Sequence, residues 1–348
     1  MALLLGIESS CDEIATAVFD TTQQKILSNK LFSQIMLHQK FGGVVPELAS
    51  RSHLEKIDEV ITQGLETAEV TLDQLDAIAV TNKPGLAGSL LIGLCFAKGL
   101  AFAKQKKLVA VNHLEGHIFS CFLAPDGTVR TDLKFPFLSL SVSGGHTSFY
   151  LVKDFGVFEE IGHIIDDAAG EAFDKISRHM GLGYPGGPII EKLAKQVGFK
   201  DFYNYPRTKQ KATSLNFTFS GLKTAVLYDM VNRGLYDFSV GKIMDSCTLE
   251  EQQKIASSLL VCITDIFKAK IQLAFKQFPH VNGLALVGGV ACNSFIKEEL
   301  TMLCKKYNRF FVAPVPQFCT DNGAMIAFVG GYKFLKNEFA PLSLDVYE

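Results

Sequence analysis

The sequence predicts an α/β protein made of two related lobes, and two observations lead to that prediction. Apolar, β-rich runs at 3–7 and 14–19 flank a short polar turn, which is the pattern of a β-hairpin. The same plan returns in the middle of the chain, with strand-like runs at 137–142 and 147–152 around a second turn. A repeated architecture without close sequence identity indicates two lobes that each begin with a hairpin.

Helices and short strands are predicted to alternate after the first hairpin. An amphipathic stretch at 48–67, an apolar strand at 77–81, a helix at 87–103 and a strand at 108–111 follow one another. The second of the two helices is rich in small apolar residues, as membrane helices are, but Lys98 within it favours a buried helix packed on a sheet. This alternation is typical of lobes in which helices cover a sheet.

The second lobe is predicted to follow the same order. Thr248, with Glu251 three residues later, has the pattern of a capping box and predicts a long helix that ends at about Lys276. A strand at 284–287 and a helix from about Ser294 come next.

The lobe boundary is predicted in the polar, turn-rich segment 124–128. This choice gives an N-terminal lobe of residues 1–128 and a C-terminal lobe of residues 129–319. We expect the last segment, from about 320 to 348, to pack back on the first lobe.

Composition limits the classes of protein that the chain can represent. For a chain of 348 residues, two domains are the default expectation. The net charge of −2 gives no indication of a nucleic-acid partner. The eight cysteines are scattered without a Cys-x-x-Cys pair, which indicates reduced thiols in a cytosolic protein. The N-terminal segment lacks the features of a signal or transit peptide, so we expect a cytoplasmic protein with no membrane association.

Two histidines four residues apart, His113 and His117, form the most informative local pattern. On a helix both imidazoles project from one face, and this arrangement suits a divalent metal. Asp321, at a predicted helix start near the C-terminus, is either a helix cap or a third ligand. Two histidines and one carboxylate with open positions favour Fe(II), and Zn(II) is the other option.

A zinc-peptidase interpretation of this pair finds no support in the spacing. The peptidase motif places a glutamate directly after the first histidine, whereas here Glu115 lies two positions after His113. At 3.6 residues per turn, that spacing turns the glutamate about 200° away from the metal-facing side. A metallopeptidase therefore remains only as the alternative function.

Three glycine-containing turns, at 143–145, 183–188 and 288–293, lie in the second lobe. Exposed backbone N–H groups in such turns bind phosphate oxygens, so three of them together favour a nucleotide cleft between the lobes. The alternative is that each is a tight turn. None matches a P-loop or a dinucleotide-binding fingerprint.

An acidic cluster at 166–175 has two interpretations. If Asp167, Glu171 and Asp174 start a helix, they share one face and could bind ribose hydroxyls, a ligand ammonium or a cation. The alternative is an acidic first turn that complements the helix dipole.

Taken together, the motifs closely resemble those of the TsaD family, the bacterial subunit of the tRNA threonylcarbamoyladenosine synthesis machinery. The resemblance covers essentially the whole chain. It rests on GIESSCDE (6–13), FGGVVPELASRSH (41–53), NHLEGH (112–117), SVSGGHT (141–147), DDAAGEAFDK (166–175), YPGGP (184–188), FSGLKT (219–224), GGVACN (288–293) and CTDNGAMIA (319–327). It implies the actin/sugar kinase/heat-shock-70 (ASKHA) fold, with two duplicated α/β lobes around a central nucleotide cleft.

The resemblance also implies roles for individual residues. His113, His117 and Asp321 match the family's metal ligands, with iron favoured and zinc as the alternative. Asp12 and Glu13 match acidic residues that are associated with activity, and we expect them to accept a proton or orient a substrate. The positions that match the family's threonylcarbamoyl-adenylate contacts are Ser141, Val142, Ser143, Gly144, Gly145, Asp174, Gly187, Glu191 and Asn293.

By this resemblance the protein transfers a threonylcarbamoyl group from threonylcarbamoyl-AMP to N6 of adenosine 37 in tRNAs that read codons beginning with A. The implied partners are the anticodon loop of tRNA, the TsaB paralogue and the TsaE ATPase, with TsaC supplying the adenylate. The stretch 200–211 interleaves aromatic and basic residues, as nucleic-acid contacts require, although a solvated loop is the alternative. A binding-only paralogue would lack the His/His/Asp set, and a kinase of the same fold would not need it.

Overall fold

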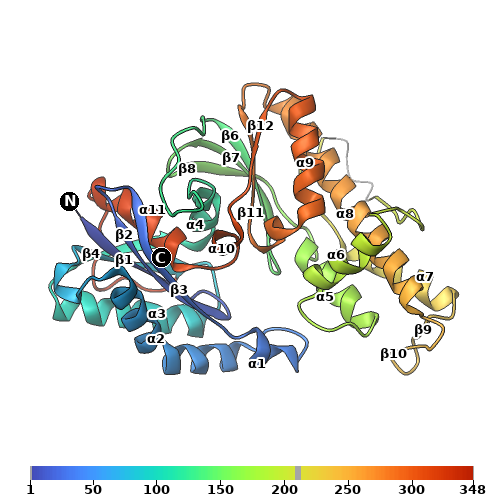
Figure 1. Ribbon diagram of the computed structural model, residues 1–348, viewed down its shortest axis with the longest axis horizontal. Coiled ribbons are helices and arrows are strands. Elements are labelled where there is room, and N and C mark those ends of the chain that lie inside the picture. Colours follow the sequence, from blue (N-terminus) through green and yellow to red (C-terminus); the bar gives the residue numbers. More distant parts are fainter. Residues whose placement is uncertain (1, 208–212, 348) are drawn as a thin grey trace. The chain divides into compact units, whose positions relative to one another are not determined.

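The structure of the protein is a computed structural model that describes residues 2–207 and 213–347. The chain divides into two compact units, shown in Figure 1. Unit 1 comprises residues 1–133 and 314–348, and unit 2 comprises residues 134–313. The last part of the chain therefore belongs to the same unit as its beginning.

Unit 1 is built on a sheet of five strands in the order β3-β2-β1-β4-β5, counted over the described residues. Strands β1, β2 and β3 are antiparallel neighbours, whereas β1, β4 and β5 run parallel. The strands are β1 (Leu3–Glu8), β2 (Glu13–Asp20), β3 (Lys25–Ser33), β4 (Ala77–Lys83) and β5 (Lys107–Asn112). The helices are α1 (Ile35–Gln39), α2 (Pro46–Ala68), the 3₁₀ turn η1 (Leu72–Gln74), α3 (Ala87–Ala103), α4 (His113–Ser120), α10 (Pro316–Cys319) and α11 (Gly323–Leu335).

Helices cover the unit 1 sheet because successive strand residues point to opposite faces. Leu5, Ile7 and Val18 belong to a buried cluster that also contains Ile57 of α2 and Leu94 of α3. Helix α11 packs along β1, β2 and β4, and nearly all of its first nine residues are apolar and buried. The sheet is therefore held between helices, and α11 brings the C-terminal segment into the middle of the unit.

Unit 2 repeats the plan of unit 1. Its sheet has the order β12-β11-β6-β7-β8 over the described residues. Strands β6, β7 and β8 are antiparallel neighbours, whereas β6, β11 and β12 run parallel. The strands are β6 (Phe137–Val142), β7 (Thr147–Asp154), β8 (Val157–Gly162), β11 (Gly283–Val287) and β12 (Phe310–Val312), with a short hairpin of β9 (Tyr236–Asp237) and β10 (Lys242–Ile243). The helices are α5 (Ala169–His179), α6 (Gly186–Gln196), α7 (Ser220–Asn232), α8 (Leu249–Gln277), the 3₁₀ turn η2 (Gly289–Cys292) and α9 (Ser294–Lys306).

The core of unit 2 is rich in phenylalanine. Phe217 and Phe219 stack on each other and meet Phe267 of α8 edge-on, while Phe149 of β7 contacts Phe217. Each of these rings is almost fully buried. Large apolar rings supply much of the burial energy of a domain, so these contacts fix α8 against the sheet.

Most of the predicted elements are confirmed. Both hairpins form, and the helices expected at 48–67 and 87–103 correspond to α2 and α3. The Thr248 side chain accepts a hydrogen bond from the Glu251 N–H, so the long helix begins where the capping pattern placed it. The eight cysteines, which all lie among the described residues, form no disulfide, and no helix in that part of the chain is long and apolar enough to cross a membrane.

Candidate functional site

The histidine pair lies on the short helix α4, directly after strand β5. Asn112 starts this helix, because its side-chain oxygen accepts hydrogen bonds from the N–H groups of Leu114 (2.8 Å) and Glu115 (3.4 Å). One turn of helix then separates the two imidazoles, whose ring centres lie 4.6 Å apart. The two imidazoles share one face of the helix, as predicted, and both histidines are buried.

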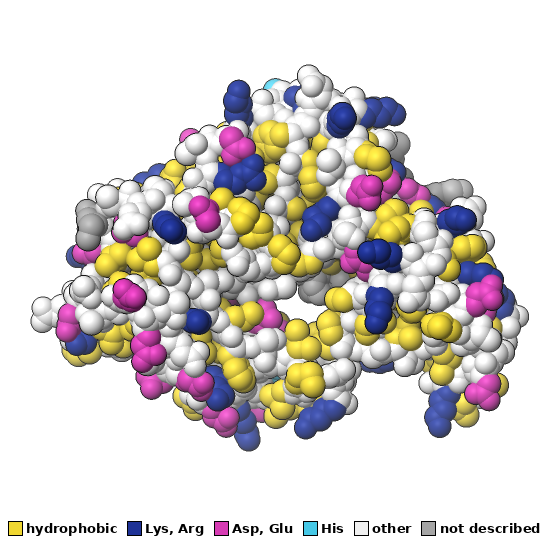
Figure 2. Space-filling view, in the orientation of Figure 1, with side chains coloured by type: hydrophobic (Ala, Val, Ile, Leu, Met, Phe, Trp, Pro, Cys, Tyr) yellow, Lys and Arg dark blue, Asp and Glu magenta, His cyan; other side chains and the backbone are white. Residues whose placement is uncertain are grey.

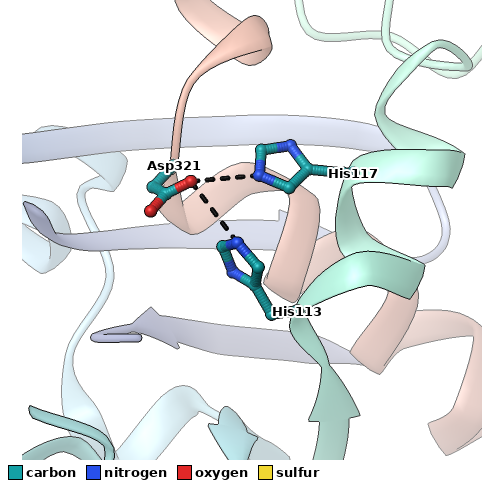
Figure 3. A group of neighbouring side chains, drawn as sticks. All are labelled: His113, His117 and Asp321. Atoms are coloured by element: carbon teal, nitrogen blue, oxygen red, sulfur yellow. Dashed lines mark hydrogen bonds and ion pairs between the residues drawn. The ribbon is translucent and has the colours of Figure 1, made fainter. Parts of the chain in front are cut away.

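Asp321 comes to the same place from the C-terminal segment, just before α11. Its Oδ1 lies 3.0 Å from Nε2 of His117 and 3.5 Å from Nε2 of His113 (Figure 3). The cap of α11 is Asn322, whose side chain accepts a hydrogen bond from the Met325 N–H. The interpretation of Asp321 as a helix cap was therefore wrong, and the carboxylate is available to the histidines.

One nitrogen or oxygen atom from each of the three side chains lies within 4.8 Å of the other two. A metal ion bonds to imidazole nitrogen and carboxylate oxygen at about 2.0–2.2 Å, so one ion fits among the three atoms after small adjustments. Two neutral imidazoles and a carboxylate are a donor set that both Fe(II) and Zn(II) accept. The side chains that the sequence pattern selected therefore form one group that can hold a metal.

Behind His113 lies a buried carboxylate that the sequence analysis did not identify. Glu8 is fully buried at the end of β1, and its Oε2 lies 3.1 Å from Nδ1 of His113. Glu8 also accepts hydrogen bonds from the Ser10 N–H (2.6 Å) and the Thr81 hydroxyl (2.7 Å). These contacts hold the imidazole with its Nδ1 toward Glu8 and its Nε2 toward Asp321.

Opposite charges set the protonation of His113 and Glu8. Burial opposes a charged imidazole, but the carboxylates of Glu8 and Asp321 raise the pKa of His113 to about 9. Burial alone would raise the pKa of Glu8, yet the attraction of His113 holds it below its usual range. Without a metal the pair is a charged imidazolium and carboxylate, so metal binding must displace a proton from His113.

Asp12 lies in the turn between β1 and β2, and Glu13 is the first residue of β2; the charge of Asp321 acts on both carboxyl groups. Burial, Asp321 and Asp12 raise the pKa of Glu13 to about 8. Burial and Asp321 also raise the pKa of Asp12. Two carboxyl groups with raised pKa values beside a candidate metal group are suited to accepting or donating a proton near neutral pH.

Glu115 turns away from the metal group, as its position on the helix predicted. Its Oε2 lies 2.8 Å from Nζ of Lys333 on α11, and the carboxylate is buried. This ion pair ties α4, which carries the histidines, to the helix that follows Asp321. Sequence reasoning did not identify Lys333, because a lysine near the end of an apolar helix resembles a solvent-exposed residue.

Two of the three glycine turns of unit 2 lie next to each other at the ends of β6 and β11. These strands are parallel neighbours, so the turns at 143–145 and 288–293 follow adjacent strand ends. Gly288 has φ +87°, and a Cβ there would collide with the backbone of Val142. A Cβ at Gly170, at the start of α5, would collide with the backbone of Ser143.

Of the remaining predicted ligand-binding residues, Asp174 lies within α5, Gly187 and Glu191 lie within α6, and Asn293 precedes α9. Asp174 accepts a hydrogen bond from the Gly186 N–H (2.6 Å), next to Gly187, and burial raises the pKa of its carboxyl group. Glu191 accepts a hydrogen bond from the Ser294 N–H (2.7 Å), and Asn293 caps α9 by accepting from the Ile296 N–H. Each polar side chain is therefore fixed by a backbone contact at a helix start.

The acidic cluster does not form the shared helix face that its spacing suggested. Helix α5 begins at Ala169, so Asp167 precedes it and forms ion pairs with Lys175 and Lys223. Glu171 pairs with Lys175 as well. Lysines from α5 and α7 thus neutralise this cluster, and only Asp174 keeps its predicted place beside the glycine turns.

The aromatic and basic stretch at 200–211 is partly used inside unit 2. Arg207 forms ion pairs with Asp201 and Asp265, and the buried Tyr205 donates its hydroxyl hydrogen to Asp229. Phe202 keeps 41 % of its surface exposed. The part of the predicted contact at 208–211 lies outside the described residues.

Comparisons with known proteins show which sequences this chain resembles. The family model TsaD, tRNA N6-adenosine threonylcarbamoyltransferase, matches residues 25–328. A protein of that name from Thermodesulfovibrio yellowstonii is 46 % identical over 99 % of this chain and 98 % of its own length. Another, from Caldicellulosiruptor saccharolyticus, is 42 % identical over 99 % of this chain and 96 % of its own length.

Solved structures are similar in fold at low sequence identity. HypF in its phosphate- and nucleotide-bound form has a TM-score of 0.58 and 14 % identity, over 97 % of this chain and 47 % of that one. Component A of the (R)-2-hydroxyglutaryl-CoA dehydratase from Acidaminococcus fermentans has a TM-score of 0.53 and 13 % identity, over 97 % and 99 %. These similarities, with the repeated five-stranded sheets, show the ASKHA type of fold.

Proposed function

This chain belongs to the TsaD family of tRNA N6-adenosine threonylcarbamoyltransferases, and from that premise we propose the reaction it catalyses. It is a transferase that acts on tRNA. It moves the threonylcarbamoyl group of threonylcarbamoyl-AMP to N6 of adenosine 37 in tRNAs that read codons beginning with A. The N6 nitrogen bonds to the carbamoyl carbon, the bond from that carbon to the AMP phosphate oxygen breaks, AMP leaves, and N6 loses one proton.

The observation that carries this proposal is the His113, His117 and Asp321 group, in a chain that matches the family over nearly its whole length. The three side chains would hold one divalent metal, with Fe(II) favoured and Zn(II) possible. When bound, the metal would supply Lewis-acid polarisation or an anchor for phosphate. Glu8 supports this role because it holds the His113 ring with Nε2 toward Asp321.

The exocyclic amine of adenine is a poor nucleophile, so the chain must position it and assist its loss of a proton. Asp12 and Glu13 are the groups that we assign to this task. The raised pKa of Glu13, about 8, matches a group that exchanges a proton near neutral pH. The assignment is supported by the influence of the Asp321 charge on both carboxyl groups.

We assign the adenylate to the glycine turns of unit 2. The turn that includes Ser141, Val142, Ser143, Gly144 and Gly145 would offer backbone N–H groups to its phosphate. The carboxylate of Asp174 would accept hydrogen bonds from the ribose hydroxyls of the adenylate. Gly187, Glu191 and Asn293 would make further contacts with the same molecule. Support comes from the packing of two of these turns next to each other and from the backbone contacts that fix Asp174 and Glu191.

The metallopeptidase alternative loses the glutamate that its sequence motif would use as general base. A peptidase of the zinc type needs a carboxylate beside the metal-bound face, and Glu115 is buried in an ion pair with Lys333. We therefore retain the transferase. We further propose that the chain works in the cytoplasm with the anticodon loop of tRNA, the TsaB paralogue and the TsaE ATPase, and that TsaC supplies the adenylate.

The proposal is tested with purified chain and partners, an unmodified tRNA and threonylcarbamoyl-AMP. Nucleoside mass spectrometry should show one N6-threonylcarbamoyladenosine formed for each AMP released. His117→Ala should lower the product at least 100-fold, whereas Lys98→Gln, which is distant from the histidines in sequence, should not. AMP release without modified adenosine, or full activity of His117→Ala, would contradict the proposal.

A further inference from the structure

The two units differ strongly in charge, although the whole chain is close to neutral. Unit 2 carries 21 Lys and Arg against 17 Asp and Glu, a net charge of +4. Unit 1 carries 13 Lys and Arg against 19 Asp and Glu, a net charge of −6. A polyanion is therefore attracted to unit 2 and repelled by unit 1.

Within unit 2 the positive charge is concentrated in two segments. Residues 192–207 contain four basic residues and one acidic residue. Residues 265–309 contain seven basic residues and three acidic ones. The rest of unit 2 has a net negative charge, so these two segments account for its positive sign.

The two segments lie side by side in the fold. The ring of Phe199, after α6, stacks on Phe295 of α9 with 4.6 Å between ring centres. Glu191 of α6 accepts a hydrogen bond from the Ser294 N–H, and the Lys200 carbonyl accepts one from Ser257 of α8. Helices α6, α8 and α9 therefore present one connected surface.

This surface carries lysines that no carboxylate neutralises within the described residues. We call it the basic face and define it by Lys192, Lys195, Lys200, Lys297, Lys305 and Lys306. All six are exposed except Lys297, which is half-buried. Figure 2 shows one side of this region, where Lys and Arg side chains lie over α9 and near α6.

A groove between α8 and α9 continues the basic face. It has a volume of about 340 Å³ and is lined by Lys306, by the ion pair of Lys268 with Glu299, and by Gln272, Met302 and Leu303. Other lysines of unit 2 are held by carboxylates, as Lys175 and Lys223 are by Asp167 and Lys268 is by Glu299. Exposed ammonium groups without such partners are the groups that bind phosphate and release counterions.

We propose that the basic face binds the phosphate backbone of the substrate tRNA and so holds it on unit 2. This inference rests on the proposed function, because tRNA is the polyanion that the reaction supplies. The contact is made to phosphates, so it is independent of base sequence and carries no codon specificity.

The test compares two variants of equal charge in the full chain. The first carries Lys195→Gln, Lys297→Gln, Lys305→Gln and Lys306→Gln. The matched control removes four lysines from unit 1, through Lys98→Gln, Lys104→Gln, Lys107→Gln and Lys336→Gln. Thermal unfolding checks that both variants fold, and binding of one unmodified tRNA is measured by fluorescence anisotropy at several salt concentrations.

The basic-face variant should bind tRNA at least tenfold more weakly than wild type at 0.1 M salt. Its plot of log affinity against log salt should be shallower by about 3, since each lost phosphate contact removes about 0.7–0.9 from the slope. The control should change neither quantity by more than about twofold or one slope unit. An equal loss of tRNA affinity in both variants overturns the proposal. An unchanged slope of log affinity against log salt in the basic-face variant overturns it as well.

Product formation separates this proposal from the proposed function. With saturating tRNA, the basic-face variant should form modified adenosine at the wild-type rate, and its KM for tRNA should rise at least tenfold. Wild-type protein that binds tRNA but forms no modified adenosine would sink the proposed function. The binding comparison would still decide the role of the basic face.

Discussion

Glu8→Gln should weaken metal binding although residue 8 does not belong to the ligand set. The two carboxylate oxygens of Glu8 receive the Ser10 N–H at 2.6 Å and the Thr81 hydroxyl at 2.7 Å, and they face Nδ1 of His113 at 3.1 Å. A glutamine offers one oxygen and an NH₂ group that repels donors. The His113 ring would then turn, or move its proton to Nε2, the atom that must bind the metal.

The expected magnitude follows from this contact. Partners that orient a metal-binding imidazole contribute about 10- to 100-fold in metal affinity, or about 1.4–2.7 kcal/mol. A second effect opposes it at neutral pH. Because Glu8 and Asp321 together raise the pKa of His113 to about 9, metal binding to the wild type must displace a proton below that pH. The variant lacks the Glu8 charge, so this competition is weaker in it. The full 10- to 100-fold loss should therefore appear at pH 9 and shrink toward pH 7.

The assay is a competition titration with a chromophoric chelator and Zn²⁺, repeated from pH 7 to pH 9. Thr81→Val is the control, because it removes one donor to Glu8 and leaves the carboxylate in place; it should lose less than about threefold. Urea unfolding of the metal-free variants separates a loss of affinity from a loss of folding. Equal affinities of Glu8→Gln and wild type at pH 9 would refute the orienting role of Glu8.

Three further outcomes are expected. Burial and neighbouring carboxylates raise the pKa of Glu13 from 4.5 to about 8, so the free energy of unfolding of the metal-free protein should fall by at most about 5 kcal/mol as pH rises through that range. In Glu13→Gln, the free energy of unfolding measured in urea should depend less on pH. An unchanged pH dependence in this variant would contradict the raised pKa. Lys333→Met leaves the buried Glu115 carboxylate without its cation and should lower the free energy of unfolding by about 3 kcal/mol. Lys333→Arg keeps the charge and should retain most of the wild-type stability. Equal urea-unfolding midpoints of Lys333→Met and wild type would argue against a contribution from the ion pair. A chelator should abolish wild-type transfer and added metal should restore it, while His117→Ala should stay inactive in both conditions; rescue of that variant by metal would remove His117 from the ligand set.

Local pattern was enough to predict the hairpins, the long helices and the histidine pair. Each depends on a period of two or 3.6 residues, or on a cap such as Thr248, and these signals lie within one turn or one strand. The shared face of His113 and His117 follows from helix geometry alone. The turning of Glu115 away from that face follows from the same geometry, and its ion pair confirms it.

The rest of the site depended on contacts between distant segments. Asp321 joins the histidines only because α11 packs through the middle of unit 1, so its sequence context could not distinguish a cap from a ligand. Glu8 ends an apolar strand, and a charge at that position was the one signal of a buried partner. The prediction that Asp167 shares a helix face with Glu171 and Asp174 was wrong. Asp167 lies before the helix and forms an ion pair with Lys223, which is far along the chain.

The most direct test of the account is mass spectrometry of nucleosides from bulk tRNA of cells depleted of this protein. The cells would be complemented with wild type or with Asp321→Ala at matched protein levels. If the chain is the transferase and Asp321 belongs to its site, N6-threonylcarbamoyladenosine falls on depletion and only the wild type restores it. Restoration by both forms would contradict the role of Asp321, and an unchanged level of the modified nucleoside on depletion would contradict the transferase function itself.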